Sequence, residues 1–278
     1  MVVVEDDNFC DEKIKILIIL LIQNNYIKGK ICRMKKNMNR ADHEINHGKK
    51  LVVKNPELIW GWDTPAGKER VKRRAQIIAA GAQLVPGKRV LEIGCGTGLF
   101  TVIFSQTGAE IIAVDISPEL LEIARLRNLP EQVQFIEKPF EECSLEGPFD
   151  AIIGSSILHH LDLEDALYKI FMLLKPGGIM SFAEPNMLNP QIAVQKNVRW
   201  VKERLGDSPD ETAFIRWKLH SLLSRVGFQD IEITPFDWLH PSTPSEAINV
   251  VSHIGKILER IPIIREFAGS LYIRSQKP

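Results

Sequence analysis

The chain has 278 residues and equal numbers of basic and acidic side chains, 35 of each, so it has no overall positive field to hold DNA or RNA. A hydrophobic content of 45% is ordinary for a globular protein with a sizeable core. The four cysteines form no CxxC pair and have no histidine at metal-ligand spacing, which predicts a reduced compartment, the cytoplasm, and no metal site. We therefore expect no nucleic-acid partner.

The first 45 residues differ in composition from the rest and predict a disordered N-terminal extension. The apolar run at residues 16–22 (ILIILLI) is far shorter than the ~20 residues of a membrane-spanning helix. An acidic beginning and the lack of a small-residue cleavage site argue against a secretory signal. The segment then becomes basic and passes Met34 and Met38, and we expect one of these methionines to be the native start.

From Arg89 onward, short apolar runs alternate with helical patterns, as in a parallel α/β sheet covered on both faces. One helix begins at Leu99, and a second begins where Ser117 can cap and Pro118 takes the first helical position. A third helix is expected over residues 162–174, followed by a KPGG turn at 175–178. The expected strands cover residues 89–94, 110–115, 133–137, 149–156 and 179–184.

The later part of the chain predicts one more well-marked helix and two strands. Residues 208–211 (SPDE) form a capping box, and Gly227 provides a stop. Between them, five apolar residues share one helix face: Ile215, Leu219, Leu222, Leu223 and Val226. The strands are expected over residues 230–235 and 270–275. No repeat or low-complexity linker interrupts the series, so residues 46–278 are interpreted as one domain.

A glycine-rich loop follows the first expected strand, in the sequence LEIGCGTG at residues 91–98. Gly94, Gly96 and Gly98 have the spacing GxGxG, whereas the dinucleotide fingerprint is GxGxxG, so the spacing argues against NAD. Asp115 ends the second strand about 20 residues later, where an acidic side chain accepts hydrogen bonds from ribose hydroxyls. An N-cap role for Asp115 is the alternative, but Ser117 is already suited to that role.

These motifs, together with SSILHHL at residues 155–161 and LLKPGG at residues 173–178, resemble the class I S-adenosylmethionine-dependent methyltransferases, closest to the methyltransferase type 11 family. The resemblance is strong over residues 89–184. It implies a Rossmann-like α/β fold: a seven-stranded, mostly parallel sheet with its last strand antiparallel and helices on both faces. Residues 46–88 would be a helical cap, 89–185 the cofactor-binding core and 186–278 substrate-side insertions and the last strands.

The resemblance also implies a site for S-adenosylmethionine and its product S-adenosylhomocysteine. The cofactor would lie over the glycine loop, with Glu92 near its methionine end and Asp115 on its ribose. Relatives often carry a Gly-Asp pair after the third strand, but Pro139 stands at the aspartate position here, which leaves Phe140 and Glu141 as candidate adenine contacts. The full expected cofactor-binding set is Glu92, Gly94, Cys95, Gly96, Gly98, Asp115, Ile116, Phe140, Glu141 and Ser155.

Methyl transfer from a sulfonium needs few catalytic side chains, because the methyl group is already electrophilic and positioning supplies most of the effect. His159 and His160, beyond the fourth strand, are candidate general bases for a protonated acceptor. The alternative is that they cap or pack the next helix. Glu184, Asn186 and His240 also follow strand ends, where loop and capping roles are the more common outcome.

Segments around the core are expected to determine the acceptor. Trp60 and Trp62 precede a helix started by Thr64 and Pro65, and packing is a more common role for such a pair than ligand stacking. Five basic residues on that helix are expected to form a solvated face, with binding of an anionic acceptor as the alternative: Lys68, Arg70, Lys72, Arg73 and Arg74. A later apolar stripe predicts either a helix packed on the sheet as a lid or a surface that meets lipid: Ala247, Val250, Val251, Ile254, Leu258 and Ile261.

Two classes of function follow. The first is a methyltransferase acting on a small-molecule or lipid-like acceptor, at oxygen or carbon, with peripheral membrane contact as an option. The second is a non-catalytic protein of the same fold that binds the cofactor or its demethylated product as a sensor or partner module.

Overall fold

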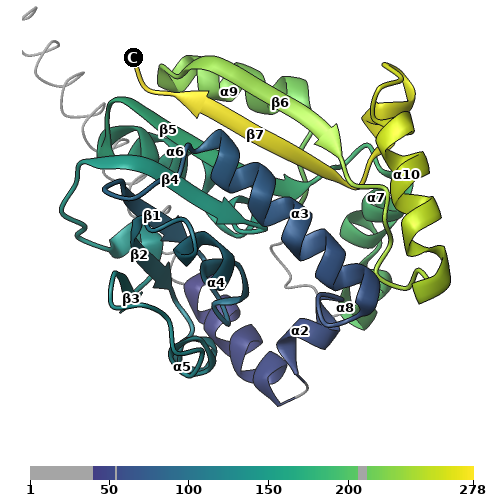
Figure 1. Cartoon of the computed structure of the whole chain (residues 1–278), viewed down its shortest axis with the longest axis horizontal. Coiled ribbons are helices and arrows are strands. Elements are labelled where there is room, and N and C mark those ends of the chain that lie inside the picture. Colours follow the sequence, from purple (N-terminus) through teal and green to yellow (C-terminus); the bar gives the residue numbers. More distant parts are fainter. Residues whose placement is uncertain (1–39, 54, 206–211) are drawn as a thin grey trace, which may run out of the picture. The chain divides into compact units, whose positions relative to one another are not determined.

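A computed structural model of the chain describes residues 40–53, 55–205 and 212–278 (Figure 1). The chain divides into two compact units, residues 1–42 and 43–278, and residues 40–42 are the described part of the first. Residues 40–52 are helical. The rest of the expected N-terminal extension, including the apolar run at 16–22 and the candidate start methionines, lies outside the described residues.

The second unit is built on one seven-stranded sheet in the order β3-β2-β1-β4-β5-β7-β6. The pairs from β3 to β5 are parallel, whereas β7 runs antiparallel to both of its neighbours, β5 and β6. The predicted fold class is therefore confirmed. The strands are β1 (Arg89–Ile93), β2 (Glu110–Asp115), β3 (Val133–Glu137), β4 (Phe149–Ser155), β5 (Leu174–Pro185), β6 (Gln229–Phe236) and β7 (Ser270–Gln276).

Helices cover both faces of this sheet, and alternate residues of each strand supply the two cores. Leu91 and Ile93 of β1 face the cluster that holds α6 and α9, whereas Val90 faces the cluster that holds α3, α4 and α5 (Figure 1). These helices are α3 (Pro65–Gly81), α4 (Leu99–Ser105), α5 (Pro118–Arg125), α6 (Leu163–Leu173) and α9 (Arg216–Val226).

The remaining helices lie in the connections. They are α2 (Pro56–Ile59), α7 (Pro190–Asn197), α8 (Arg199–Leu205), α10 (Ile248–Leu258) and the 3-10 turns η1 (Phe140–Glu142), η2 (Leu158–His160), η3 (Ser245–Ala247) and η4 (Ile264–Phe267). Within the described ranges, no helix is both long and apolar enough to cross a membrane.

Local signals at helix starts are confirmed. Thr64 caps α3 by accepting from the Gly67 backbone N–H, and Ser117 caps α5 by accepting from Leu120. Proline occupies the first position of both helices, where the missing N–H has no intrahelical partner to lose.

Two boundaries differ from the prediction. The expected KPGG turn at residues 175–178 is part of β5, which begins at Leu174. The pairing register of β5 with β4 shifts there, because Phe149 pairs with Leu174 and Ala151 pairs with Ile179. The helix α9 begins at Arg216, so residues 212–215 are not helical and Ile215 is its N-cap residue. The expected capping box at residues 208–211 lies outside the described residues, and Gly227 ends α9 with a φ of 110° as expected.

Candidate functional site

The glycine loop lies where the strand order reverses. Strand β1 has β2 on one side and β4 on the other, so the connections after β1 and after β4 leave the sheet in opposite directions. The loop after β1 lies at the carboxyl edge of the sheet, at this switch point. In open α/β sheets the crevice at such a point is where ligands bind. Helix α4 begins immediately after the loop, with Gly98 as its N-cap residue.

The glycines of this loop have different roles. Gly94 has a φ of 69°, and a Cβ atom there would clash with the Ile157 side chain, so its missing side chain makes room for protein. Gly96 has a φ of 53°, and the nearest atom to a Cβ there would be in the Trp60 ring, 3.7 Å away. Gly96 is therefore where the loop backbone is open to approach.

Asp115 ties the ends of β1 and β2 together. Its Oδ2 accepts from the Gly96 backbone N–H at 2.7 Å, and its Oδ1 accepts from the Ser117 N–H at 2.9 Å. Burial raises the pKa of Asp115, although the backbone N–H donors oppose that shift. A carboxylate has about four acceptor positions, so two protein hydrogen bonds leave room for ligand hydroxyls. Ile116, the next residue, is half-buried.

Glu92 is a buried carboxylate on β1. The residue is 2% exposed, and its Oε2 atom has no hydrogen-bond partner. Burial raises its pKa to about 8. Burial also raises the pKa of the Cys95 thiol well above its usual value, which keeps that thiol protonated and inert. An unpartnered buried carboxylate oxygen beside the glycine loop is the kind of group that a cationic part of a ligand would satisfy.

The loop after β3 is held by a lysine from α6. The Nζ atom of Lys169 donates to the backbone carbonyls of Phe140 (2.6 Å), Glu141 (3.1 Å) and Cys143 (2.7 Å). The Phe140 ring is buried in the core, so only its backbone remains for a ligand. The loop that lacks the usual acid at Pro139 is thus ordered from the next helix, a contact that the sequence reasoning did not anticipate.

Arg74 is a candidate cofactor-binding residue that the expected cofactor-binding set does not include. It was expected on a solvated face, but it is only 2% exposed. Its Nη1 atom donates to the Ala183 carbonyl at 3.0 Å. The same atom lies 3.3 Å from Ser156 Oγ and 3.5 Å from Ser155 Oγ. Its Nη2 atom bonds to Ser270 Oγ, whereas its Nε atom has no partner.

The signal for Arg74 was present in the helical period. Val71, Arg74, Ala75 and Ile78 recur at the spacing i, i+3, i+4 and i+7, and all four are buried. The expected solvated face is also wrong for Arg70, which pairs with Asp237 at 2.9 Å and has a side chain only 14% exposed.

The loop after β4 is organised around Glu184. This carboxylate is completely buried, and it accepts from the backbone N–H groups of Ile157 and Leu158 at 2.9 Å and bonds to His159 Nδ1 at 2.6 Å. Burial alone would raise its pKa, but the His159 ring and the two N–H donors outweigh burial, so the pKa is lowered. Glu184 thus stays ionised and fixes the orientation of the His159 ring.

His160 lies beside His159, with ring centroids 4.2 Å apart. Its Nδ1 atom lies 3.0 Å from a carboxylate oxygen of Glu44, on the N-terminal helix. His159 is 5% exposed, and the His160 side chain is 18% exposed. Both histidines are therefore largely buried, and the His159 ring is held by a carboxylate, as that of a general base would be.

The segment around α2 covers the glycine loop. Glu57 accepts from the Thr97 hydroxyl at 2.7 Å and pairs with Arg127, whose Nε donates to the Thr97 carbonyl at 2.5 Å. Trp62 packs edge-on against Phe100, with centroids 5.7 Å apart. The geometry therefore shows packing for Trp62, whereas the Trp60 ring lies 3.7 Å from the position a Cβ atom would take at Gly96.

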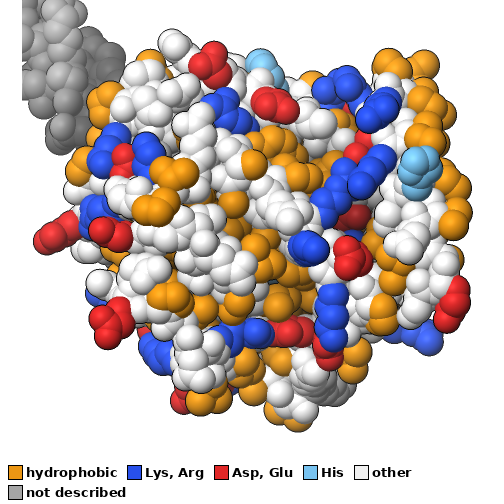
Figure 2. All heavy atoms as spheres, in the orientation of Figure 1, with side chains coloured by type: hydrophobic (Ala, Val, Ile, Leu, Met, Phe, Trp, Pro, Cys, Tyr) orange, Lys and Arg blue, Asp and Glu red, His pale blue; other side chains and the backbone are white. Residues whose placement is uncertain are grey.

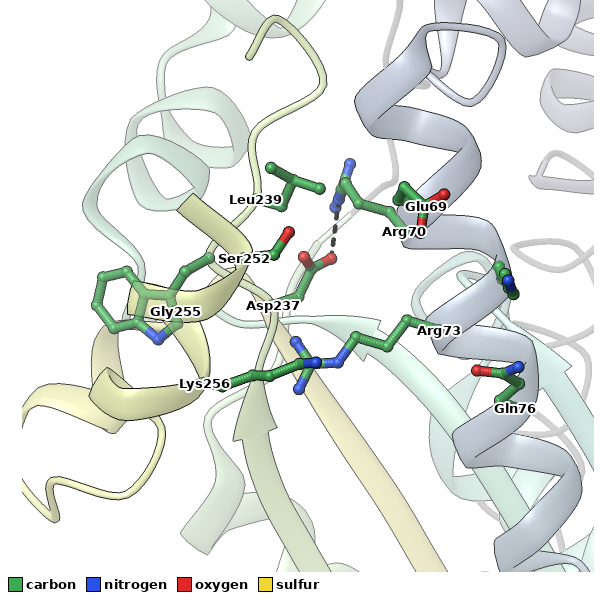
Figure 3. A pocket seen from close by; sticks show the side chains of 11 residues that line it. Glu69, Arg70, Arg73, Gln76, Asp237, Leu239, Ser252, Gly255 and Lys256 are labelled. Atoms are coloured by element: carbon green, nitrogen blue, oxygen red, sulfur yellow. Dashed lines mark hydrogen bonds and ion pairs between the residues drawn. The ribbon is translucent and has the colours of Figure 1, made fainter. Parts of the chain in front are cut away.

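A pocket of about 380 Å³ lies between α3 and α10 (Figure 3). The guanidinium group of Arg73, which lines the pocket, and that of the buried Arg74 both lie 5.6 Å from the Phe236 ring centroid. Its lining side chains come from α3, from the loop after β6 and from α10: Glu69, Arg70, Lys72, Arg73, Gln76, Asp237, Trp238, Leu239, Ser252, Gly255 and Lys256.

The other polar residues singled out in the sequence have local roles. Asn186 donates to the carbonyls of Glu266 and Ala268 at 2.8 Å, and exposed His240 contacts Ser242 and Gln191. Across the described ranges, no cluster of three or more His, Cys, Asp or Glu side chains is arranged to hold a metal.

Comparison with known proteins matches residues 90–178 to a family model described as a methyltransferase domain. A ubiquinone biosynthesis O-methyltransferase of Xanthomonas campestris pv. campestris (strain B100) is 36% identical over 118 residues, which is 41% of this chain and 49% of that protein. The chain thus spans about half the length of the curated relatives that it matches.

Solved structures share the fold over a larger part of the chain. A crystal structure of a SAM-dependent methyltransferase of Thermotoga maritima, described as a possible histamine N-methyltransferase, has a TM-score of 0.62 at 20% identity and covers 84% of this chain and 99% of its own. The [4+2]-cyclase SpnF has a TM-score of 0.54 at 22% identity and covers 74% of this chain and 80% of its own. Residues 90–178 therefore match the model of a methyltransferase domain, and the chain has the Rossmann-like fold of the class I S-adenosylmethionine-dependent methyltransferases.

Proposed function

We propose that this protein transfers a methyl group from S-adenosylmethionine to a small-molecule or lipid-like acceptor, at oxygen or carbon. The observation that carries the proposal is the loop at residues 94–98, which is held against Asp115 at the switch point of the sheet and is open at Gly96. In this proposal residues 46–88 form the cap, 89–185 bind the cofactor and 186–278 face the acceptor.

The residues present fit the α-amino acid group of this cofactor's methionine portion. The unpartnered Glu92 oxygen suits the α-ammonium group, and the buried Arg74, with its free Nε, suits the carboxylate. Asp115 would accept from the ribose hydroxyls, while Ile116 and the backbone of Phe140 and Glu141 would border the adenine. Cys95, Gly98 and Ser155 complete the expected lining.

The cofactor supplies an electrophilic methyl group, and the task of the protein is to position donor and acceptor and to exclude water. The α2 segment would serve exclusion, because Glu57 ties it to Thr97 of the glycine loop. For an acceptor that is protonated at neutral pH, we propose His159 as the base, oriented by Glu184, with His160 as the second candidate.

The acceptor class rests on the curated relatives. They are named as O-methyltransferases of ubiquinone biosynthesis, and this chain matches about half of their length. Their name favours a small-molecule acceptor that is methylated at oxygen.

Calorimetric titration with S-adenosylmethionine, S-adenosylhomocysteine and NAD tests the cofactor. We expect both adenosyl compounds to bind, NAD not to bind, and Asp115→Asn to weaken binding by at least about tenfold through lost ribose contacts. Asp150→Asn is the matched control, because Asp150 also accepts from a backbone N–H, that of Arg89, at the far end of β1. Binding of NAD alone would overturn the proposal.

A non-catalytic, cofactor-binding protein is the second candidate, because a [4+2]-cyclase shares this fold and the fold alone therefore does not entail methyl transfer. Acceptor-dependent formation of S-adenosylhomocysteine separates the two candidates. Tight binding without turnover across phenolic, enolic and carboxylic acceptors would favour the sensor.

A further inference from the structure

The most apolar exposed surface of the described chain lies on α10 and the turn that follows it. Of seventeen large hydrophobic residues that are exposed in the described ranges, seven fall within residues 250–267. We call them the α10 surface: Val250 (60% exposed), Ile254 (49%), Ile257 (48%), Ile261 (39%), Ile263 (77%), Ile264 (38%) and Phe267 (44%). Figure 2 shows apolar side chains along the outer edge of this helix.

The α10 surface forms one stripe that the fold does not use. Val250, Ile254 and Ile257 recur at the spacing i, i+4 and i+7, which places them on one face of α10, and Ile261 follows in the turn after the helix. A different edge of α10 holds the helix to the protein: Ile248 and Val251 pack with Ala66 and Leu239, and Gly255 lies against Trp238. The sequence prediction had combined both edges into one stripe, and the structure separates them.

Two basic residues of this segment lie beside the apolar stripe, and one of them, Lys256, also lines the pocket between α3 and α10. Lys256 and Arg260 are exposed and have no carboxylate partner within the described residues. The two acids of the same segment are occupied by arginines from other elements: Glu259 is held bidentately by Arg73 at 2.8 and 2.5 Å, and Glu266 pairs with Arg216 at 2.8 Å.

We propose that the α10 surface docks on an anionic phospholipid bilayer. An apolar stripe flanked by unpaired lysine and arginine is the pattern of a helix that lies in the membrane interface rather than spanning it. Each such cation adds attraction to an anionic leaflet, and the apolar side chains add burial in the acyl boundary. Charge complementarity selects anionic lipid over a neutral surface. This proposal does not depend on methyl transfer.

Vesicle flotation of the full chain tests the proposal. We expect the wild-type protein to float with vesicles of phosphatidylcholine and one quarter phosphatidylglycerol, and to float much less with phosphatidylcholine alone. Ile257→Asp combined with Ile263→Asp should lower partitioning at least about tenfold, since it removes two apolar anchors and adds two negative charges. Lys256→Gln with Arg260→Gln should abolish the preference for anionic lipid.

Met172→Asp is the matched control, because Met172 is 73% exposed on α6, away from α10. The full chain also carries the apolar run at residues 16–22, so the difference between variants decides, not wild-type binding alone. The proposal is overturned if the wild-type protein does not float with anionic vesicles, or if the Ile257 and Ile263 variant floats as well as the Met172 control. It is also overturned if light scattering shows a dimer that the same variant disrupts, because the surface would then be a subunit interface.

Discussion

Replacing Arg74 with methionine should separate ligand binding from stability. Arg74 is buried without a carboxylate at ion-pair distance in the described chain, and burial lowers its pKa from 12.5 to about 10. The folded state binds the proton less tightly than the unfolded state, so the penalty for charged Arg74 is fully present at neutral pH and fades only as pH rises through 10. A shift of this size corresponds to about 3 kcal/mol against folding.

Methionine fills a similar volume without charge, so Arg74→Met removes that penalty. It also leaves the Ser270 hydroxyl without its arginine donor, at a cost of about 1 kcal/mol, whereas the Ala183 carbonyl keeps its bond from the Ser156 N–H at 2.8 Å. We therefore expect the variant to have a free energy of unfolding equal to or above that of the wild type. Affinity for S-adenosylhomocysteine should fall at least about tenfold, because the proposed carboxylate partner is lost.

Arg70→Met is the matched comparison, one helical turn away. Arg70 is paired with Asp237, whose side chain is 4% exposed, so removing the guanidinium leaves a buried carboxylate without its partner. That loss should cost about 3–5 kcal/mol. Urea unfolding followed by tryptophan fluorescence at pH 7, together with calorimetric binding, measures both effects. If Arg74→Met loses as much stability as Arg70→Met, Arg74 is a structural residue and the reasoning is refuted.

Three further predictions follow from the same contacts. The pKa of Glu92 is raised to about 8, so its contribution to stability is full below pH 4.5 and is lost as pH rises toward 8. The unfolding free energy of the wild type should therefore fall between pH 5 and 8 by on the order of 5 kcal/mol, and Glu92→Gln should flatten that fall. Identical pH profiles for the two proteins would contradict this. Lys169 orders the loop at residues 140–143, which would border the adenine. Lys169→Met should therefore weaken the binding of S-adenosylhomocysteine more than the binding of an analogue that lacks the adenine amino group. Equal losses of affinity in calorimetry would assign Lys169 a general structural role. Glu57→Gln should speed release of S-adenosylhomocysteine in stopped-flow fluorescence, since the α2 segment loses its charged tie to Arg127; an unchanged release rate would show that α2 does not control exit.

Local physics explains why the sheet and the glycine loop could be predicted. Apolar runs such as residues 110–115 are buried on both faces, so their composition alone indicates a parallel strand. Thr64 and Ser117, each followed by proline, start helices through contacts within one turn. Gly96 and Asp115 come together because adjacent parallel strands end at the same edge.

The missed residues depend on contacts between segments far apart in the chain. Lys169 reaches the loop after β3 only because α6 packs beside it, and Glu184 meets His159 across two strand ends. Arg74 was misjudged because its charge suggested solvent, while its burial follows from the side of α3 that faces the sheet.

The sequence by itself determined the strand and helix series, the Rossmann-like class and the position of the cofactor loop, because periodicity, capping and glycine conformation act over a few residues. Only the tertiary structure decided which charges are buried, which acids are already paired and which edge of α10 stays exposed. Those outcomes depend on desolvation and on partners brought together from distant segments, and no local pattern contains that information.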